Sequence, residues 1–246
     1  MIKFFRNIRR SLLHEGKTSR YFKYAIGEIV LVVIGILIAL QINNWNETYK
    51  GKKTAKISMQ ALKFDLNKDL IALKKVIENS VQDSSKLGDL KRRMSNDDLT
   101  LDTLVHMARF EFNPWVPLSI SFNNNTINSL RATGNINLLP KEVQETLLNL
   151  DALQQGYLQS FSNDVGIYLD NTILYTRSYP FKDVGHIDPK SKLADSIWSK
   201  ATLSGLGAEL NGLVGVKYSN YYELISSLQK IKKETQTLVN FLDRYE

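Results

Sequence analysis

The stretch that decides the fold is residues 24–47, YAIGEIVLVVIGILIALQINNWNE. From Tyr24 to Leu40 it contains one charged residue, Glu28. Extended to residues 22–42, a helix of this sequence is about 31 Å long, which matches the hydrocarbon core of a bilayer. Aromatic residues suited to the membrane interfaces flank the stretch at Tyr21 and Trp45. We therefore predict a transmembrane helix over residues 22–44.

Two other interpretations of this stretch fit less well. A cleaved signal peptide would need a charged region of about 23 residues, and no A-x-A site follows the apolar run. A core helix of a soluble domain would have a polar side, whereas Ile, Val and Leu surround this helix.

The net positive charge of the chain is concentrated near its N-terminus. Residues 1–44 hold seven Lys and Arg against two acidic residues, out of 32 and 25 in the whole chain. Because basic residues favour the cytoplasmic side, we expect the N-terminus in the cytoplasm and the large C-terminal part outside it. The predicted segments are a basic arm (1–21), the transmembrane helix (22–44) and an extracytoplasmic helical domain (45–246).

The arm is patterned as an amphipathic helix, with apolar residues in one arc and basic residues opposite. Such a helix lies on anionic lipid headgroups, although a frayed basic tail that only sets the topology is an equal alternative. The residues expected at the membrane surface are Lys3, Phe4, Phe5, Arg6, Arg9 and Arg10.

Glu28 shares one face of the predicted transmembrane helix with Gly35 and Ala39. Small residues allow close helix approach in lipid, and an ionisable residue there usually faces protein or water. This face predicts a contact with a second copy or with a partner membrane protein. Alternatively, Glu28 reaches the interface or pairs with Lys23.

The rest of the chain has helical periodicity without a strand–helix alternation. We expect a long helix over residues 55–94, continuous with the transmembrane helix, and a short one from Leu101 to Arg109 after a Thr100 cap. A two-turn helix should end at Gly134, and the next should run from Pro140 to about Tyr175. Further helices are expected over residues 191–202 and from Ala208 onward, with the 205–207 glycines at the junction. The predicted fold is all-α, a bundle of three long helices plus short ones.

Two segments resemble a known family. MIKFFRNIRR followed by residues 24–47, and more weakly TINSLRATGNINLL at residues 126–139, are similar to an uncharacterised domain-of-unknown-function family of single-pass membrane proteins from Bacteroidota. The resemblance implies an inner-membrane anchor and a periplasmic helical domain. It implies no reaction and no catalytic residue.

The sequence predicts no catalytic, cofactor-binding or metal-binding residues. The chain has no cysteine, so disulfides and thiolate chemistry are excluded. Of the three histidines, His14 lies in the arm, His106 is expected to be packed or half-exposed, and His186 forms the only His/Asp pair with Asp188. Basic runs such as residues 91–93 and 230–233 are expected to be solvated helix faces, so no nucleic acid partner is predicted.

The sequence thus predicts a non-enzymatic, membrane-anchored protein whose periplasmic helical domain serves protein interaction or scaffolding. The alternatives are a ligand-sensing module that relays through a partner and, less favoured, a periplasmic hydrolase. The bilayer is the one partner that the sequence identifies.

Overall fold

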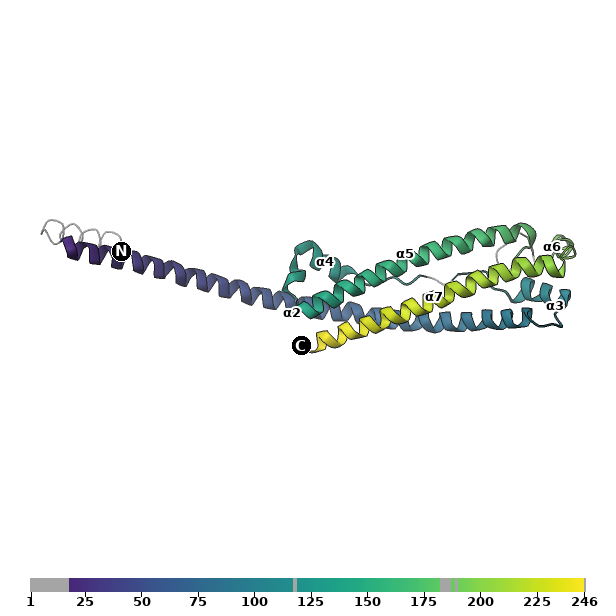
Figure 1. The fold of residues 1–246 in the computed structure, drawn as a ribbon, viewed down its shortest axis with the longest axis horizontal. Coiled ribbons are helices and arrows are strands. Elements are labelled where there is room, and N and C mark those ends of the chain that lie inside the picture. The colour runs from purple at the N-terminus through teal and green to yellow at the C-terminus, as the bar shows by residue number, and fades with distance from the viewer. Residues whose placement is uncertain (1–17, 117–118, 182–186, 189, 246) are drawn as a thin grey trace. The chain divides into compact units, whose positions relative to one another are not determined.

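The computed structural model describes residues 18–116, 119–181, 187–188 and 190–245, and every regular element among them is helical (Figure 1). An all-α fold of three long helices plus short ones is thereby confirmed. The long helices are α2 (Thr18–Met94), α5 (Lys141–Ser178) and α7 (Leu203–Asp243), and the short ones are α3 (Leu101–His106), the π-helical turn η1 (Met107–Glu111), α4 (Asn125–Thr133), the 3₁₀ turn η2 (Asn135–Leu138) and α6 (Lys192–Trp198).

The chain divides into two compact units, Met1–Ile57 and Ser58–Glu246. In the first unit, the described residues form the N-terminal part of α2. The helix contains Gly27 and Gly35 but no proline, and a helix without proline keeps its backbone hydrogen bonds along its length. The expected continuity between the apolar stretch and the following helix is confirmed, because α2 is unbroken from Thr18 to Met94.

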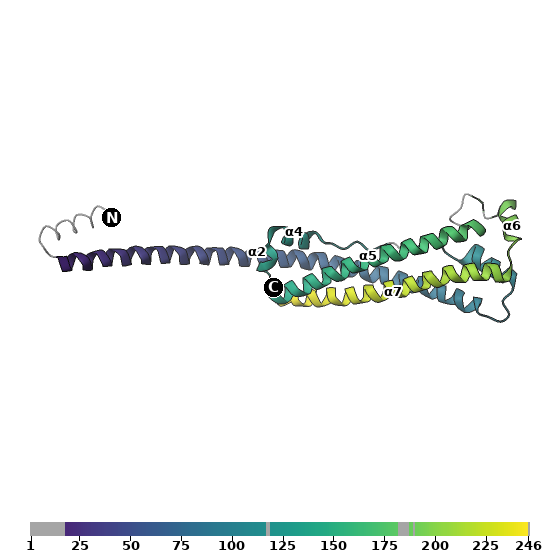
Figure 2. The same ribbon diagram turned by 45° about the horizontal axis from the view of Figure 1, so that its top comes forward.

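The second unit is a bundle in which α5 and α7 lie side by side along their length, as both ribbon views show (Figures 1 and 2). Apolar residues at spacings of three and four form the buried side of α7. The same periodicity continues on α2 from Leu62 to Leu90. The buried residues of this α7 stripe include Leu210, Val214, Tyr221, Leu224, Leu228 and Ile231.

Helix ends follow the predicted caps. The Thr100 side chain accepts a hydrogen bond from the backbone N–H of Thr103, as expected for the N-cap of α3. Gly134 ends α4 with φ of 70°, a left-handed conformation that glycine adopts without steric cost. Both boundaries were predicted from these residue types.

Three boundaries were predicted wrongly. The helix after Thr100 turns into η1 at Met107, because this π-helical turn buries Met107 and Ala108 and brings Glu111 within 2.9 Å of Arg93. The helix expected over residues 191–202 ends at Trp198. The last helix begins at Leu203 rather than Ala208, since Thr202 caps the backbone N–H of Gly205, so the glycines lie inside its first turns and not at a junction.

Buried polar contacts tie α4 and the preceding loop to the bundle. Asp69, which is 1% exposed, accepts hydrogen bonds from the backbone N–H and the side-chain amide of Asn123. Arg131 pairs with the buried Asp151 of α5 at 2.7 Å. These contacts fix Asn123 and α4 against the bundle.

Candidate functional site

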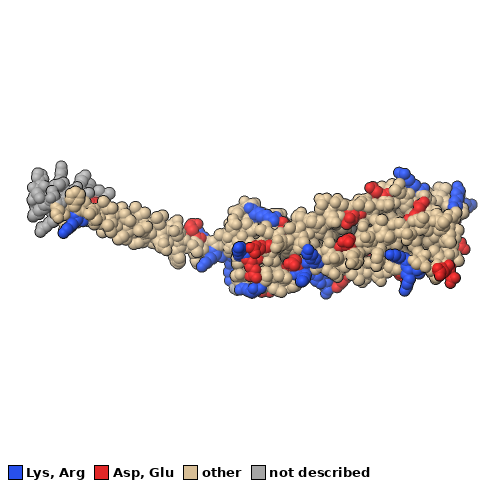
Figure 3. All heavy atoms as spheres, in the orientation of Figure 1, with Lys and Arg blue, Asp and Glu red and all other residues tan. Residues whose placement is uncertain are grey.

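The first candidate site is the apolar part of α2 itself. Large side chains here are exposed on every side, with Ile29 64%, Leu31 61% and Ile38 55% accessible. In Figure 3 this part of the first unit carries uncharged atoms along its length. Among the described residues, α2 is the one helix long and apolar enough to cross a membrane, and none of its apolar window is buried. Exposed apolar surface on this scale indicates a lipid or protein environment.

Glu28, Gly35 and Ala39 lie on this segment at spacings of seven and four. Gly35 and Ala39 are exposed, and Glu28 is partly exposed. No atom lies within 4 Å of the position that a Cβ would occupy on Gly35. The structure thus leaves the predicted contact face open at Gly35, and what covers it stays a prediction.

The residues predicted at the membrane surface lie outside the described residues. They are Lys3, Phe4, Phe5, Arg6, Arg9 and Arg10. The histidines His14 and His186, for which no site was predicted, also lie outside the described residues. His106 is exposed, lies 3.6 Å from Glu111 and contacts the ring of Phe110. Within the described ranges, no three His, Asp or Glu side chains are grouped as a metal site would require.

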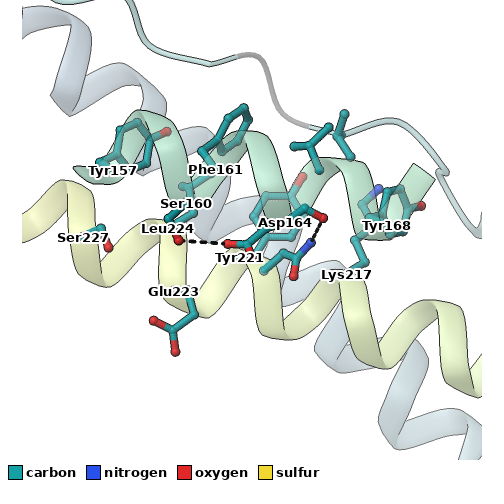
Figure 4. Close-up of a pocket in the computed structure, with 13 residues that line it drawn as sticks. Tyr157, Ser160, Phe161, Asp164, Tyr168, Lys217, Tyr221, Glu223, Leu224 and Ser227 are labelled. Carbon is teal, nitrogen blue, oxygen red and sulfur yellow. Dashed lines mark hydrogen bonds between the residues drawn. The ribbon is translucent and has the colours of Figure 1, made fainter. Parts of the chain in front are cut away.

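The second candidate site is a pocket of about 50 Å³ in the bundle (Figure 4). At roughly 15 Å³ per water, this volume holds about three water molecules. Residues of α5 and α7 form most of its wall. Val116, from the loop that follows η1, also lines it. The lining residues that the argument uses are Tyr157, Asp164, Tyr168, Lys217 and Tyr221.

Lys217 is the most unusual residue of this pocket. Its side chain is 4% exposed, and its ammonium donates hydrogen bonds to the carbonyl oxygens of Asn113 and Trp115. The rings of Phe112 and Tyr168 lie 5.6 Å away, within the range of a cation–π contact. Burial lowers the pKa of Lys217 to about 8, and the Asp83 carboxylate acts in the opposite direction.

Three tyrosines in the pocket differ in how their hydroxyl groups are satisfied. The Tyr168 hydroxyl donates to the carbonyl oxygen of Pro114 at 2.8 Å, and that of Tyr221 donates to Asp83 at 3.3 Å. The Tyr157 hydroxyl is buried and has no hydrogen-bond partner among the described residues. Burial raises the pKa of Tyr157 to about 12, so this group is a neutral donor at physiological pH.

The polar groups of the pocket mainly hold the loop of residues 112–116 in place. Lys217 uses two of its three N–H donors on backbone carbonyls, which fixes the loop of residues 112–116 against α7. Tyr168 does the same from α5 through Pro114. The Tyr157 hydroxyl remains buried without a hydrogen-bond partner among the described residues.

Sequence reasoning missed Lys217, although the pattern contains a signal for it. It occupies a buried position of the α7 stripe, between Val214 and Tyr221. A lysine at core spacing predicts a buried, hydrogen-bonded ammonium. Of the neighbouring tyrosines, Tyr221 is buried, whereas Tyr222 is 68% exposed.

Over the described residues, these features define an all-helical protein with one candidate membrane-spanning helix and a small pocket in its bundle. A family model described as "Family of unknown function (DUF6090)" matches residues 28–108, from the apolar part of α2 to the turn after α3. This match is to an uncharacterised family, as the resemblance implies, and it covers less than half of the chain. No curated protein and no solved structure matches the chain.

Proposed function

We propose that the chain is a single-pass membrane protein of non-enzymatic function, whose helical domain binds protein partners on the extracytoplasmic side of the inner membrane. The observation that carries the proposal is the unburied apolar segment of α2. Each of its large side chains would expose apolar surface at a cost of about 25 cal/mol per Å² in water, and lipid removes that cost.

The orientation rests on charge. Seven Lys and Arg residues precede Tyr24, against five in residues 45–63, and loops with excess Lys and Arg stay in the cytoplasm. The domain of residues 45–246 would then be periplasmic, as the family resemblance implies. The absence of cysteine is compatible with an oxidising compartment.

The non-enzymatic assignment is supported by the use of the pocket's polar groups. The buried ammonium of Lys217 and the hydroxyl of Tyr168 both bind backbone carbonyls within the chain. Groups engaged in this way hold the fold and are not free for proton transfer or nucleophilic attack.

The experiment uses the lack of cysteine. Single-cysteine variants Ser11→Cys in the arm and Gln229→Cys on the exposed side of α7 are expressed at full length and treated in intact cells with a membrane-impermeant maleimide. We expect labelling of the Gln229→Cys variant only, and labelling of both variants after lysis. Recovery of the uncleaved chain in the soluble fraction without detergent would overturn the membrane assignment.

A matched pair of variants tests the apolar segment directly. Val33→Lys with Leu37→Lys places two charges at the centre of the segment, where each costs about 2.5–3.5 kcal/mol on insertion scales. We expect this variant to leave the membrane fraction. Ser226→Lys with Gln229→Lys adds the same charge to α7 and should leave fractionation unchanged.

A second candidate function, the sensing of a small ligand, is favoured by the pocket between α5 and α7, because one of its lining residues, Tyr157, has a buried hydroxyl without a partner. The volume of about 50 Å³ admits only molecules of a few heavy atoms. Short neutral amides and ketones offer the acceptor that this hydroxyl lacks. A thermal-shift series on the full chain in detergent, with Tyr157→Phe as the control, tests this function, and equal shifts in both proteins would contradict it.

A further inference from the structure

One side of α5 forms an uncharged, exposed stripe. Its residues recur at alternating spacings of four and three over about 42 Å of helix, and all of them are exposed to solvent. No atom lies within 4 Å of a Cβ built on its glycine, Gly166. We refer to these residues as the outer stripe of α5: Leu148, Ala152, Gln155, Gln159, Ser162, Gly166, Leu169, Ile173 and Thr176.

Positions at this spacing lie along one line of the helix surface, so they can face a partner helix over its whole length. An average repeat of 3.5 residues keeps one line of side chains facing a partner helix, with each side chain inserted between four residues of the other. Apolar side chains at one end of the stripe, Leu169 and Ile173, are 45% and 56% exposed. The chain itself places no helix on this side of α5 in the described residues.

The exposed side of α5 also differs in charge from those of α2 and α7. From residue 148 to 177, the exposed charged residues are Asp170 and Arg177, because Asp151 is buried and Asp164 is partly buried. The exposed side of α2 in the second unit carries Lys68, Lys74, Lys75, Glu78 and Lys86, and that of α7 carries Glu209, Glu223, Lys230, Lys232, Lys233 and Asp243.

From these observations we infer that the outer stripe of α5 binds the same stripe of a second copy of this chain. The inference rests on the proposed function and names the partner of the helical domain. A neutral stripe meets its own copy without charge repulsion, whereas burying the charged side of another helix would leave ions desolvated. Small residues at Ala152, Ser162 and Gly166 permit close approach of the two helices.

The area of the stripe indicates a weak pair. A helix about 10 Å wide and about 42 Å long presents roughly 420 Å² per copy. Both copies together bury less than the 1,200–2,000 Å² or so of stable complexes. The membrane anchor resolves this shortfall, because two tethered copies meet at a raised effective concentration. Pairing should therefore be strong in the membrane and weak after dilution.

Disulfide crosslinking of the full chain in native membranes tests the inference, since the protein has no cysteine of its own. The stripe variants are Gln155→Cys, Ser162→Cys and Thr176→Cys. The control variants are Gln82→Cys on α2 and Ser226→Cys on α7, which are equally exposed. We expect disulfide-linked dimers from the Ser162→Cys variant, which lies near the centre of the stripe, at least about tenfold faster than from controls, which corresponds to about 1.4 kcal/mol.

The pattern of linked positions reports the direction of the pair. In a parallel pair, all three stripe variants form homodimers, because each introduced cysteine meets its own copy. In an antiparallel pair, the Ser162→Cys variant near the centre forms homodimers, whereas the introduced cysteines of Gln155→Cys and Thr176→Cys lie apart from their own copies. Either pattern supports the inference. Crosslinking of all stripe variants at the rate of the controls would overturn it.

Charge placed on the stripe provides a second test. Leu169→Glu with Ile173→Glu, combined with Ser162→Cys, should reduce crosslinking at least about tenfold. Ile71→Glu with Val81→Glu on α2 replaces side chains of similar exposure, 72% and 47%, and should leave it unchanged. All four side chains are exposed, so none of these changes removes core packing.

The two proposals fail separately. A chain that stays in the membrane fraction but shows no stripe-specific crosslinks overturns the pairing and leaves the anchored interaction protein in place. Stripe-specific dimers of a chain found in the soluble fraction would overturn the anchor and leave the pairing in place. Crosslinks from the stripe to a different protein, without homodimers, would also overturn the pairing.

Discussion

The Lys217 ammonium of α7 donates a hydrogen bond to the carbonyl oxygen of Asn113, 104 positions earlier in the chain. The same ammonium donates a second hydrogen bond to the Trp115 carbonyl, so this side chain holds the loop that follows η1 against α7. The bundle thus uses a buried cation where the helical pattern would place an apolar residue. The first two predictions concern this lysine.

Replacing Lys217 with methionine should destabilise the second unit by about 1–3 kcal/mol. Two charge-assisted hydrogen bonds and their loop anchorage are lost, whereas the desolvation cost of the buried ammonium is recovered. Denaturant unfolding of the full chain in detergent measures the change. Lys230→Met on the exposed side of α7 serves as the control, with an expected effect within about 0.5 kcal/mol.

Stability should depend on pH with a maximum near pH 10. Burial lowers the folded-state pKa of Lys217 from 10.5 to about 8, so between these values the unfolded chain binds a proton that the folded chain lacks. The free energy of unfolding therefore rises as the pH increases from about 8 toward 10.5. Below pH 8 this contribution is absent.

The buried tyrosines act with the opposite sign at higher pH. Burial raises the pKa of Tyr157 and Tyr168 from 10.0 to about 12, so above pH 10 the folded chain holds protons that the unfolded chain has released. Stability then falls from pH 10 to 12. Unfolding free energies from pH 7 to 12 test both limbs, and a rising limb that persists in Lys217→Met would refute the assignment.

Tyr157→Phe should leave the fold unchanged or stabilise it by up to about 1 kcal/mol. The hydroxyl that it removes is buried without a partner, so its desolvation cost disappears and no hydrogen bond is lost. Tyr168→Phe is the matched control and should cost about 0.5–1.5 kcal/mol through its bond to Pro114. Melting temperatures of both variants in detergent measure the two changes. A melting temperature lowered equally in both variants would contradict the prediction.

Two glycine substitutions should shift stability in opposite directions. Gly134→Ala forces a side chain into a left-handed conformation at the end of α4 and should cost about 1 kcal/mol. Gly215→Ala lies on the exposed side of α7 with open space around its Cβ, and should stabilise by about 0.5–1 kcal/mol. A destabilised Gly215→Ala variant would show that this side of α7 is covered in the native protein.

Most of the fold was predictable because its signals are local. The caps at Thr100 and Gly134 depend on residues within one helical turn, and periodicity alone indicated the three long helices. The start of α7 was predicted wrongly, because two glycines close to each other indicate a break. Burial of Leu206 inside the bundle, which no local pattern reports, outweighs their low helix propensity.

The candidate pocket was not predictable. Lys217 occupies a core position by spacing, but its partners lie in a loop more than a hundred residues away. The outer stripe of α5 was hidden for a related reason. Its spacing is present in the sequence, yet only the packed bundle shows that no helix of the described residues covers it.

The sequence by itself determined the apolar helix that predicts a membrane anchor, the all-helical class and the helix ends set by caps, since each follows from composition or spacing within a few turns. The tertiary structure alone decided where the loop of residues 112–116 is held, which tyrosine hydroxyl lacks a partner and whether another described helix covers the outer stripe of α5. Those features depend on contacts between residues far apart in the chain, and only the packing of the helices brings such residues together.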